Sequence, residues 1–587
     1  MMVDVKKTVL ALIACPVTMW SANITFNNAG GNLASEEAGD WIGGAAPTES
    51  DGIKIDKGGV YTISHDIKRD NLTVAADGAI LRFGDKHLTT TGSVSGKKDN
   101  ATIVFDGGIF NLSGTGNFSP AQVAGANAVA IVTNGCVITN VSQFNATSYA
   151  NLSRTVVSGN SRIYAQKCYV GTQGGSGNRL EIVEGAQVHV DGVVSLDGNG
   201  SGDQYGGSQL LVSGAGSLLH QVGEETAFVR LGQRLAGDRF VVTEGASAVS
   251  DYGGVKLGKE DSRVIVEKGA MLGVPRFYYD GSENATVVSN AIFACSSDFS
   301  LAYADGESQY NQTGRSNNVF LATGADASVS IKGPDIFGTG HHNVFRLQDG
   351  ARLQPSSSMK EFMSQTCNSR FEVSGEGTLF GKSDDQFWVA HGSAVISSNN
   401  VISVEDGAKV LAANVYLQGV ANEIVISNAT VEIEGASDVT FGIGARSAGT
   451  PHTNNVLSLA GTMPKLKINN GGNNILPLRL SGGSTLRFRV PKDGFAKGHV
   501  PVELACALEI DTTSFFEIDC EEWTAHTGGK LHLIKAKAFF DNKNDPVGTT
   551  VSRLNLAVLP PECTLILDKG NVYLKCPRRD GFVVSIR

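Results

Sequence analysis

The stretch Asn400-Val-Ile-Ser-Val-Glu-Asp-Gly407-Ala-Lys-Val410 decides the fold of this chain, because the same unit recurs along most of its length. An asparagine opens an alternating apolar run, a Gly-Ala turn follows, and a second apolar run begins directly after the turn. Apolar residues at every second position are typical of a strand with one buried face. Related units occur at Asn71–Ile80, Asn178–Val188 and Asn343–Leu353. The pattern predicts short strands joined by tight glycine turns.

The turn glycine, or an asparagine in its place, can be followed as a marker along the chain. From residue 58 to residue 482 the markers define 16 intervals of about 26.5 residues, ranging from 20 to 34. They are residues 58, 78, 107, 135, 159, 185, 214, 245, 269, 290, 324, 350, 375, 407, 428, 461 and 482. A propeller blade repeats at roughly 40–45 residues. The shorter period favours one continuous solenoid with three short strands per coil.

Two columns of residues are expected to stack along this solenoid. Glycine at the marker permits a backbone conformation that other residues resist, and Asn290 and Asn428 suit the same place because asparagine tolerates left-handed backbone. Apolar residues keep a six-residue step across the turn, as in Ile182/Val188, Val212/Leu218 and Val404/Val410. The upstream polar residue is predicted to form an interior ladder. Its members are Asn71, Asn100, Asn178, Ser208, Asp238, Ser262, Asn284, Asn318, Asn343, Asn368, Asn400, Asn422, Asn455 and Asn474.

Composition excludes several classes of protein. The chain has 587 residues, a net charge of −10, 71 glycines, only 15 prolines and 18% charged residues. Low charge and scarce proline argue against a disordered chain. The negative balance argues against a nucleic-acid binder, which needs a basic surface. No sustained 3.6-residue period is present, so alternating α/β folds and coiled coils are not expected; a single short helix is predicted within 355–362.

The N-terminus has the pattern of a secretory signal. Lys6 and Lys7 precede the apolar stretch Thr8–Trp20, which is too short to span a bilayer comfortably. Cleavage near Ala22 gives a signal peptide of residues 1–22. The alternative is lipidation at Cys15, in the lipobox-like run Leu12-Ile-Ala-Cys15, which would anchor the protein to a membrane. Either way the protein is expected to be exported, to the cell surface or the medium, with no transmembrane segment after signal removal.

The chain divides into four predicted parts. Residues 1–22 are the signal peptide, 23–55 an N-terminal capping segment, 56–490 the parallel β-helix and 491–587 a β-rich C-terminal cap. In the last part the repeat units stop and strands are predicted at 531–538, 554–559, 564–567 and 571–575, with a hairpin turn at 568–571. Four cysteines lie there, and Cys506/Cys520 and Cys563/Cys576 are pairs that an oxidising compartment would permit.

Two segments carry a resemblance to a known family. Asp40-Trp-Ile-Gly-Gly-Ala-Ala-Pro47 and the residues to Ile55 resemble the first segment of bacterial surface β-helix proteins. The following repeats are similar to autotransporter passenger domains and their barrel-less relatives, and Leu554–Leu574 resembles their closing segment. The resemblance implies a single-stranded right-handed parallel β-helix with a surface, adhesive role. The C-terminal part lacks the ten-residue strands of a membrane barrel, so self-translocation is not expected.

Parallel β-helices also host polysaccharide lyases and glycoside hydrolases, whose sites need carboxylates on adjacent coils. Asp384, Asp385 and His391 resemble fragments of such a site, but six residues from Asp385 to His391 are far fewer than one coil. No metal or cofactor motif is present in the sequence, so no cofactor is expected. Catalysis therefore remains the alternative hypothesis.

Aromatic residues in two long intervals are the candidate ligand-binding residues. The intervals 290–324 and 375–407 contain Tyr303, Tyr310, Phe387 and Trp388, which we expect in loops on one face, where they would stack on sugar rings. Packing against the solenoid is the competing interpretation. The sequence predicts an exported β-solenoid with a structural, adhesive or glycan-contacting role. Its partners would be glycans or cell-surface components, and not nucleic acid.

Overall fold

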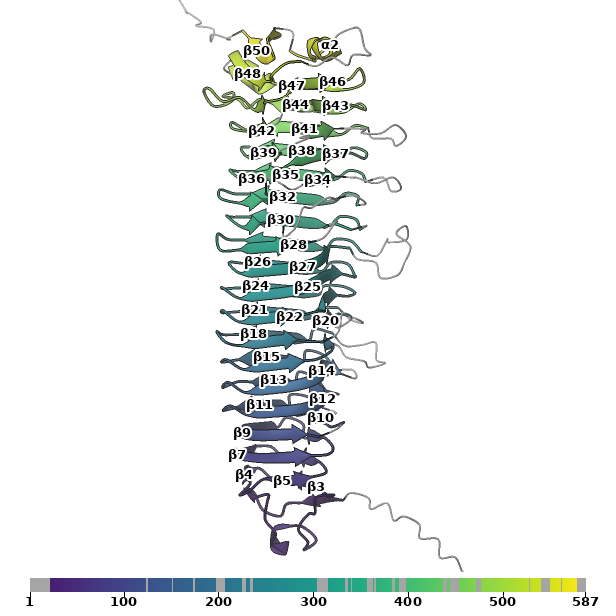
Figure 1. The fold of residues 1–587 in the computed structure, drawn as a ribbon, viewed down its shortest axis with the longest axis vertical. Helices are drawn as coiled ribbons and strands as arrows, with labels where there is room; N and C mark the ends of the chain where they lie inside the picture. The colour runs from purple at the N-terminus through teal and green to yellow at the C-terminus, as the bar shows by residue number, and fades with distance from the viewer. Residues whose placement is uncertain are drawn as a thin grey trace, which may run out of the picture.

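The computed structural model describes residues 22–113, 115–122, 125–149, 151–172, 175–196, 206–223, 228–232, 236–302, 315–332, 336–338, 340–355, 363, 366–382, 386–389, 397–435, 441–443, 453–470, 477–526, 528–539, 549–560 and 562–577. In this part the chain is all-β, and its strands stack along one axis into a tall column (Figure 1). The long sheet is largely parallel, as in a β-solenoid. No helix in the described residues is long and apolar enough to cross a membrane.

In the regular coils, one strand lies on each of three faces. In one coil, face A carries β15 (Arg179–Val183), face B carries β16 (Gln187–Val190) and face C carries β17 (Val194–Leu196). The parallel partners in the next coil are β18 (Gln209–Ser213), β19 (Leu218–Gln221) and β20 (Phe228–Leu231). The predicted arrangement, in which each strand stacks on its counterpart, is confirmed for these coils.

Alternate side chains of each strand point inward and stack on their counterparts. On face C the register aligns Val94, Phe118, Phe144, Cys168 and Val194, and all five are fully buried. Stacking like on like therefore builds one continuous hydrophobic core along the column.

The glycine column is confirmed for most markers and corrected for three. At the corner between faces A and B, Gly185, Gly350 and Gly407 all have positive φ (76°, 89° and 85°). Gly58, Gly78 and Gly482 instead lie at the corner that precedes face A, before β4 (Gly59–Thr62), β7 (Ala79–Thr90) and β44 (Thr485–Arg489). Gly84, paired with Gly107, takes the place in the column that was predicted for Gly78.

The buried residues on either side of the turn between faces A and B lie six positions apart only where that turn is short. Ile182 and Val188 are both fully buried, as predicted. After Val212, however, the buried residue is Leu219 rather than Leu218, because the turn contains a second left-handed glycine, Gly216, with φ of 83°. One extra residue moves the following side chains to the opposite face of the strand.

The predicted polar ladder exists and lies inside the column, at the corner that precedes face A. Asn284 donates its backbone N–H to Oδ1 of Asn318 at 3.0 Å, and Asn318 donates to Oδ1 of Asn343 at 3.0 Å. All three side chains are fully buried. Ser369 replaces the predicted Asn368, since it is Ser369 that accepts the N–H of Asn343. The ladder satisfies corner N–H groups that the strands leave unpaired.

Two other predicted members do not join the ladder: Asn71 precedes β6 (Leu72–Val74) on face C, and Asn100 is exposed while Ala101 is buried in its place. Asn474 lies outside the described residues.

The parallel ladder extends beyond residues 56 and 490. At the N-terminal end β1 (Asn23–Thr25) pairs with β3 (Gly52–Ile55), and the rings of Phe26 and Trp41 meet at 4.8 Å over the end of the core. At the other end β44 pairs in parallel with β47 (Phe515–Asp519). The stacking of coils therefore starts before and continues after the predicted limits.

The C-terminal segment changes to antiparallel pairing. β48 (Gly529–Lys535) pairs with β50 (Asn571–Cys576), which forms the predicted hairpin with β49 (Thr564–Asp568). Cys563 and Cys576, which the predicted hairpin brings together, form a disulfide. Cys506 and Cys520 are buried free thiols, so the other permitted pairing is not formed.

Two helices also form in this segment. Residues 521–526 form α1 (Glu521–His526), and part of the predicted strand 554–559 belongs to α2 (Thr549–Asn555). A helix satisfies its own backbone groups where the last coil offers few strand partners. All of the short helix predicted within 355–362 except Pro355 lies outside the described residues.

Candidate functional site

A polar groove lies on face C, near the N-terminal end of the column. Four strands place it: β8 (Val94–Gly96), β10 (Asn117–Ser119), β12 (Val137–Ser148) and β14 (Arg162–Thr172). Their register aligns Ser95, Ser119, Asn145 and Tyr169 in one outward column. The column spans three steps between coils, about 14 Å. Each residue flanks an inward core residue, so alternation brings polar groups to the surface coil after coil.

The groove has a volume of about 430 Å³ and is lined almost entirely by uncharged hydrogen-bonding side chains. Its lining residues are Ser93, Ser95, Lys97, Asn117, Ser119, Gln122, Gln143, Asn145, Ser148, Tyr149, Tyr169 and Thr172. Lys97 is the one charged residue among these, and none of them is a carboxylate. The lining therefore offers amides and hydroxyls as donors and acceptors without a fixed anion.

Several features keep this lining in place. The floor is nearly closed to solvent, with Ser95 6%, Ser119 3% and Tyr169 4% exposed. Asn145 donates from Nδ2 to Oγ of Ser119 at 3.0 Å, which links two coils. Burial raises the pKa of Tyr169, so its phenol stays protonated near neutral pH and can donate a hydrogen bond.

Tyr149 forms an aromatic rim to the groove. Its side chain is 47% exposed, and its backbone N–H donates to the carbonyl of Thr172 at 3.0 Å. Its φ is +62°, a left-handed conformation that is rare for a bulky residue. Strain of this kind persists only where surrounding contacts enforce it, and it clusters at functional sites.

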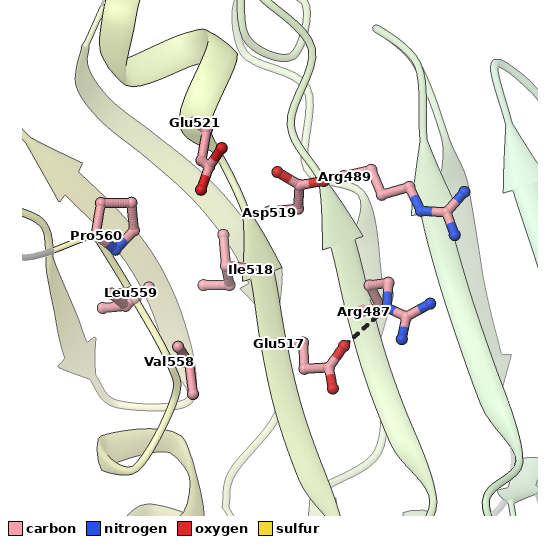
Figure 2. Close-up of a pocket in the computed structure, with 9 residues that line it drawn as sticks. All are labelled: Arg487, Arg489, Glu517, Ile518, Asp519, Glu521, Val558, Leu559 and Pro560. Atoms are coloured by element: carbon pink, nitrogen blue, oxygen red, sulfur yellow. Dashed lines mark hydrogen bonds and ion pairs between the residues drawn. The ribbon is translucent and has the colours of Figure 1, made fainter.

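A second, larger pocket of about 860 Å³ opens between β47 and the segment that follows α2. Figure 2 shows Ile518 and Glu521 on the side of Val558, Leu559 and Pro560. Glu517 and Asp519 lie on the other side of β47, toward Arg487 and Arg489 of the neighbouring strand. Nε of Arg487 donates a hydrogen bond to Oε2 of Glu517 at 2.8 Å, which offsets the negative charge of that carboxylate. The pocket lies beside β47, and an isolated parallel β-bridge pairs Glu517 of this strand with Val558.

The predicted ligand-binding aromatics are only partly described. Tyr303 and Tyr310 lie outside the described residues, as do Asp384, Asp385 and His391. Phe387 and Trp388 are in strand β34 (Gln386–Val389), not in a loop as predicted, and they pair with Val415 and Tyr416 of β37 (Asn414–Leu417). The parallel pairing in a five-stranded sheet places their backbone in the solenoid wall. Sugar stacking by these four residues stays a prediction.

Sequence reasoning missed the groove because it followed the glycine turns and the long intervals. The signal was present in the strands of face C. Ser93-Val-Ser95, Asn117-Phe-Ser119 and Gln143-Phe-Asn145 repeat one pattern, a core residue between two uncharged polar ones, on successive coils. Aligning these triplets would have placed their outer residues in two adjacent columns.

Comparisons of the chain with protein-family models, with curated proteins and with solved structures find no match.

Proposed function

We propose that this protein is an exported β-solenoid of the cell surface that contacts glycans through the polar groove on face C. The lining of the groove is the observation that supports the proposal. Hydroxyl and amide groups from successive coils line the groove, no carboxylate is among them, and the partly exposed Tyr149 forms its rim. Sugars present many hydroxyl groups and apolar ring faces. Fixed amides, hydroxyls and an aromatic ring match both features.

The length of the groove favours an extended oligosaccharide over a single small molecule. Ser95, Ser119, Asn145 and Tyr169 repeat at the spacing of the coils, so similar hydrogen-bonding groups recur along the axis. A chain of similar sugar units would meet the same groups repeatedly. Repetition of weak contacts raises affinity without requiring one deep pocket.

Export is part of the same proposal, and the Cys563–Cys576 disulfide supports it, because disulfides persist mainly outside the reducing cytoplasm. Cleavage near Ala22 or lipidation at Cys15 would decide between a secreted and an anchored form. A right-handed coil is proposed because parallel strands joined by crossovers are right-handed in about 98% of cases. Kinship with autotransporter passenger domains is likewise proposed, on the repeats and the two terminal segments.

The C-terminal segment is proposed to act as a cap. A solenoid end presents unpaired strand edges that promote association between molecules. The antiparallel sheet of β48, β49 and β50 follows directly after the last parallel strands. A change from parallel to antiparallel pairing stops further coils from adding in the same register.

A glycan array tests the proposal, run beside a depolymerisation screen against plant and mucin polysaccharides. The full-length protein should bind neutral glycans, and Asn145→Ala and Tyr149→Ala should each weaken binding about tenfold or more. Tyr164→Ala is the matched control, because Tyr164 is 39% exposed on face B and does not line the groove. Equal binding by all variants would contradict the assignment. Release of new reducing ends by the wild-type protein would support the alternative, a polysaccharide lyase or glycoside hydrolase.

A further inference from the structure

Three buried cysteines meet where the last coil joins the C-terminal hairpin. The sulfur atoms of Cys520, Cys563 and Cys576 all lie within 4.8 Å of one another. Cys563 and Cys576 are bridged, whereas Cys520 is a free thiol. Cys520 directly follows β47, while Cys563 precedes β49 and Cys576 ends β50. The cluster thus joins the end of the solenoid to the segment that covers it.

We propose that Cys520 is the exchange partner of the Cys563–Cys576 disulfide, so that the hairpin can be covalently tied either to itself or to the last coil. The chemistry needs no outside oxidant. The thiolate of Cys520 attacks one sulfur of the disulfide, a new S–S bond forms to that sulfur, and the old S–S bond breaks. The other cysteine leaves as a thiolate and takes up the proton that Cys520 lost.

The two kinds of pairing constrain different parts of the chain. The Cys563–Cys576 bond spans 13 residues and closes a loop inside the hairpin. A bond from Cys520 to either partner would cross from the end of β47 to the hairpin and close a much longer loop. Longer loops constrain the unfolded chain more strongly. Exchange would therefore lock the hairpin onto the last coil.

The environment of Cys520 accounts for its remaining a thiol beside a disulfide. Its side chain is fully buried. Burial, with smaller contributions from Asp519 and Glu521, raises the pKa of Cys520 to about 11, so little thiolate exists in the closed fold near neutral pH. Thiolate is the attacking species, and exchange is therefore slow until this end of the molecule opens.

Disulfide mapping of the full-length protein tests the proposal. Wild type, Cys563→Ser, Cys576→Ser and Cys506→Ser are folded with a mixture of reduced and oxidised glutathione, acid-quenched, alkylated in denaturant and digested without reduction. In Cys563→Ser the main product should be Cys520–Cys576, and in Cys576→Ser it should be Cys520–Cys563. Cys506 is buried and outside the cluster, so Cys506→Ser should keep the wild-type bond.

In Cys563→Ser and Cys576→Ser, one hairpin cysteine remains. If it pairs only with glutathione, and Cys520 is recovered in alkylated form, the proposal is overturned. Wild type provides a second measurement that does not depend on a variant folding. Partial unfolding of the wild type in denaturant at mildly alkaline pH, without added thiol, should produce peptides linked through Cys520. Their absence, with Cys563–Cys576 retained throughout, would equally overturn it.

Discussion

Substituting Gly407 tests the glycine column directly. Gly407 lies in the turn between β35 (Val401–Glu405) and β36 (Lys409–Ala412), with φ of +85°. A β-carbon added there would lie 3.3 Å from Cα of Glu376 in the preceding coil. Gly407→Val combines this contact with a conformation that β-branched residues resist, and should cost on the order of 1–3 kcal/mol.

Gly407→Asn is the matched variant, because it adds the same β-carbon but tolerates left-handed backbone. The chain itself places Asn290 and Asn428 in this column, with φ of 47° and 51°. The asparagine variant should therefore lose well under half of what the valine variant loses. The difference in stability between the two variants therefore separates the cost of backbone strain from the cost of crowding.

Hydrogen exchange of peptides covering 401–412 measures the effect where it arises. A solenoid opens locally, so a single global midpoint would dilute a change in one coil. A loss of about 2 kcal/mol corresponds to roughly 30-fold faster exchange. Equal exchange of the valine and asparagine variants would refute the left-handed turn as the reason for glycine, since crowding alone would then explain both.

Three further predictions follow from the ladder, the charges and the C-terminal end. Asn400→Leu should lower the free energy of unfolding by about 2–4 kcal/mol, measured by global unfolding or local hydrogen exchange. It leaves the buried N–H of Ser369 and the buried carbonyl of Thr366 without their hydrogen-bond partners at 2.9 and 2.8 Å. Burial alone would raise the pKa of Glu432, but hydrogen bonds from two lysines outweigh it and lower the pKa to about 2, from 4.5. Its stabilising effect should be complete above pH 4.5 and be lost as the pH falls toward 2, and Glu432→Gln should remove that dependence of the melting temperature. Truncation after residue 490 exposes the side of β44 that pairs with β47, so light scattering should show aggregation, and a soluble monomer would contradict a capping role.

The sequence was informative wherever local chemistry repeats from coil to coil. The sequence alone predicted Gly407 in the turn and Asn400 in the polar ladder. A left-handed turn favours glycine, and a buried corner favours a side chain that both donates and accepts hydrogen bonds. The three misplaced markers, Gly58, Gly78 and Gly482, show the limit of that reading. Two corners of one coil can use the same residue type, and only the pairing of strands tells them apart.

The C-terminal segment shows the same limit. The hairpin and its Cys563–Cys576 bond follow from local spacing, because a short turn brings the two cysteines together. The place of Cys520 does not, because it depends on the last coil meeting a hairpin more than 40 residues later in the chain.

By itself, the sequence determined the strand period, the turn residues and the polar ladder of this protein. These are properties of a short segment, fixed by alternation and by allowed backbone angles. Only the tertiary structure decided that Ser95, Ser119, Asn145 and Tyr169 share one groove and that three cysteines share one cluster. The reason is physical: neighbours across coils are set by the length of every intervening turn, and one inserted residue, as beside Gly216, shifts what stacks on what.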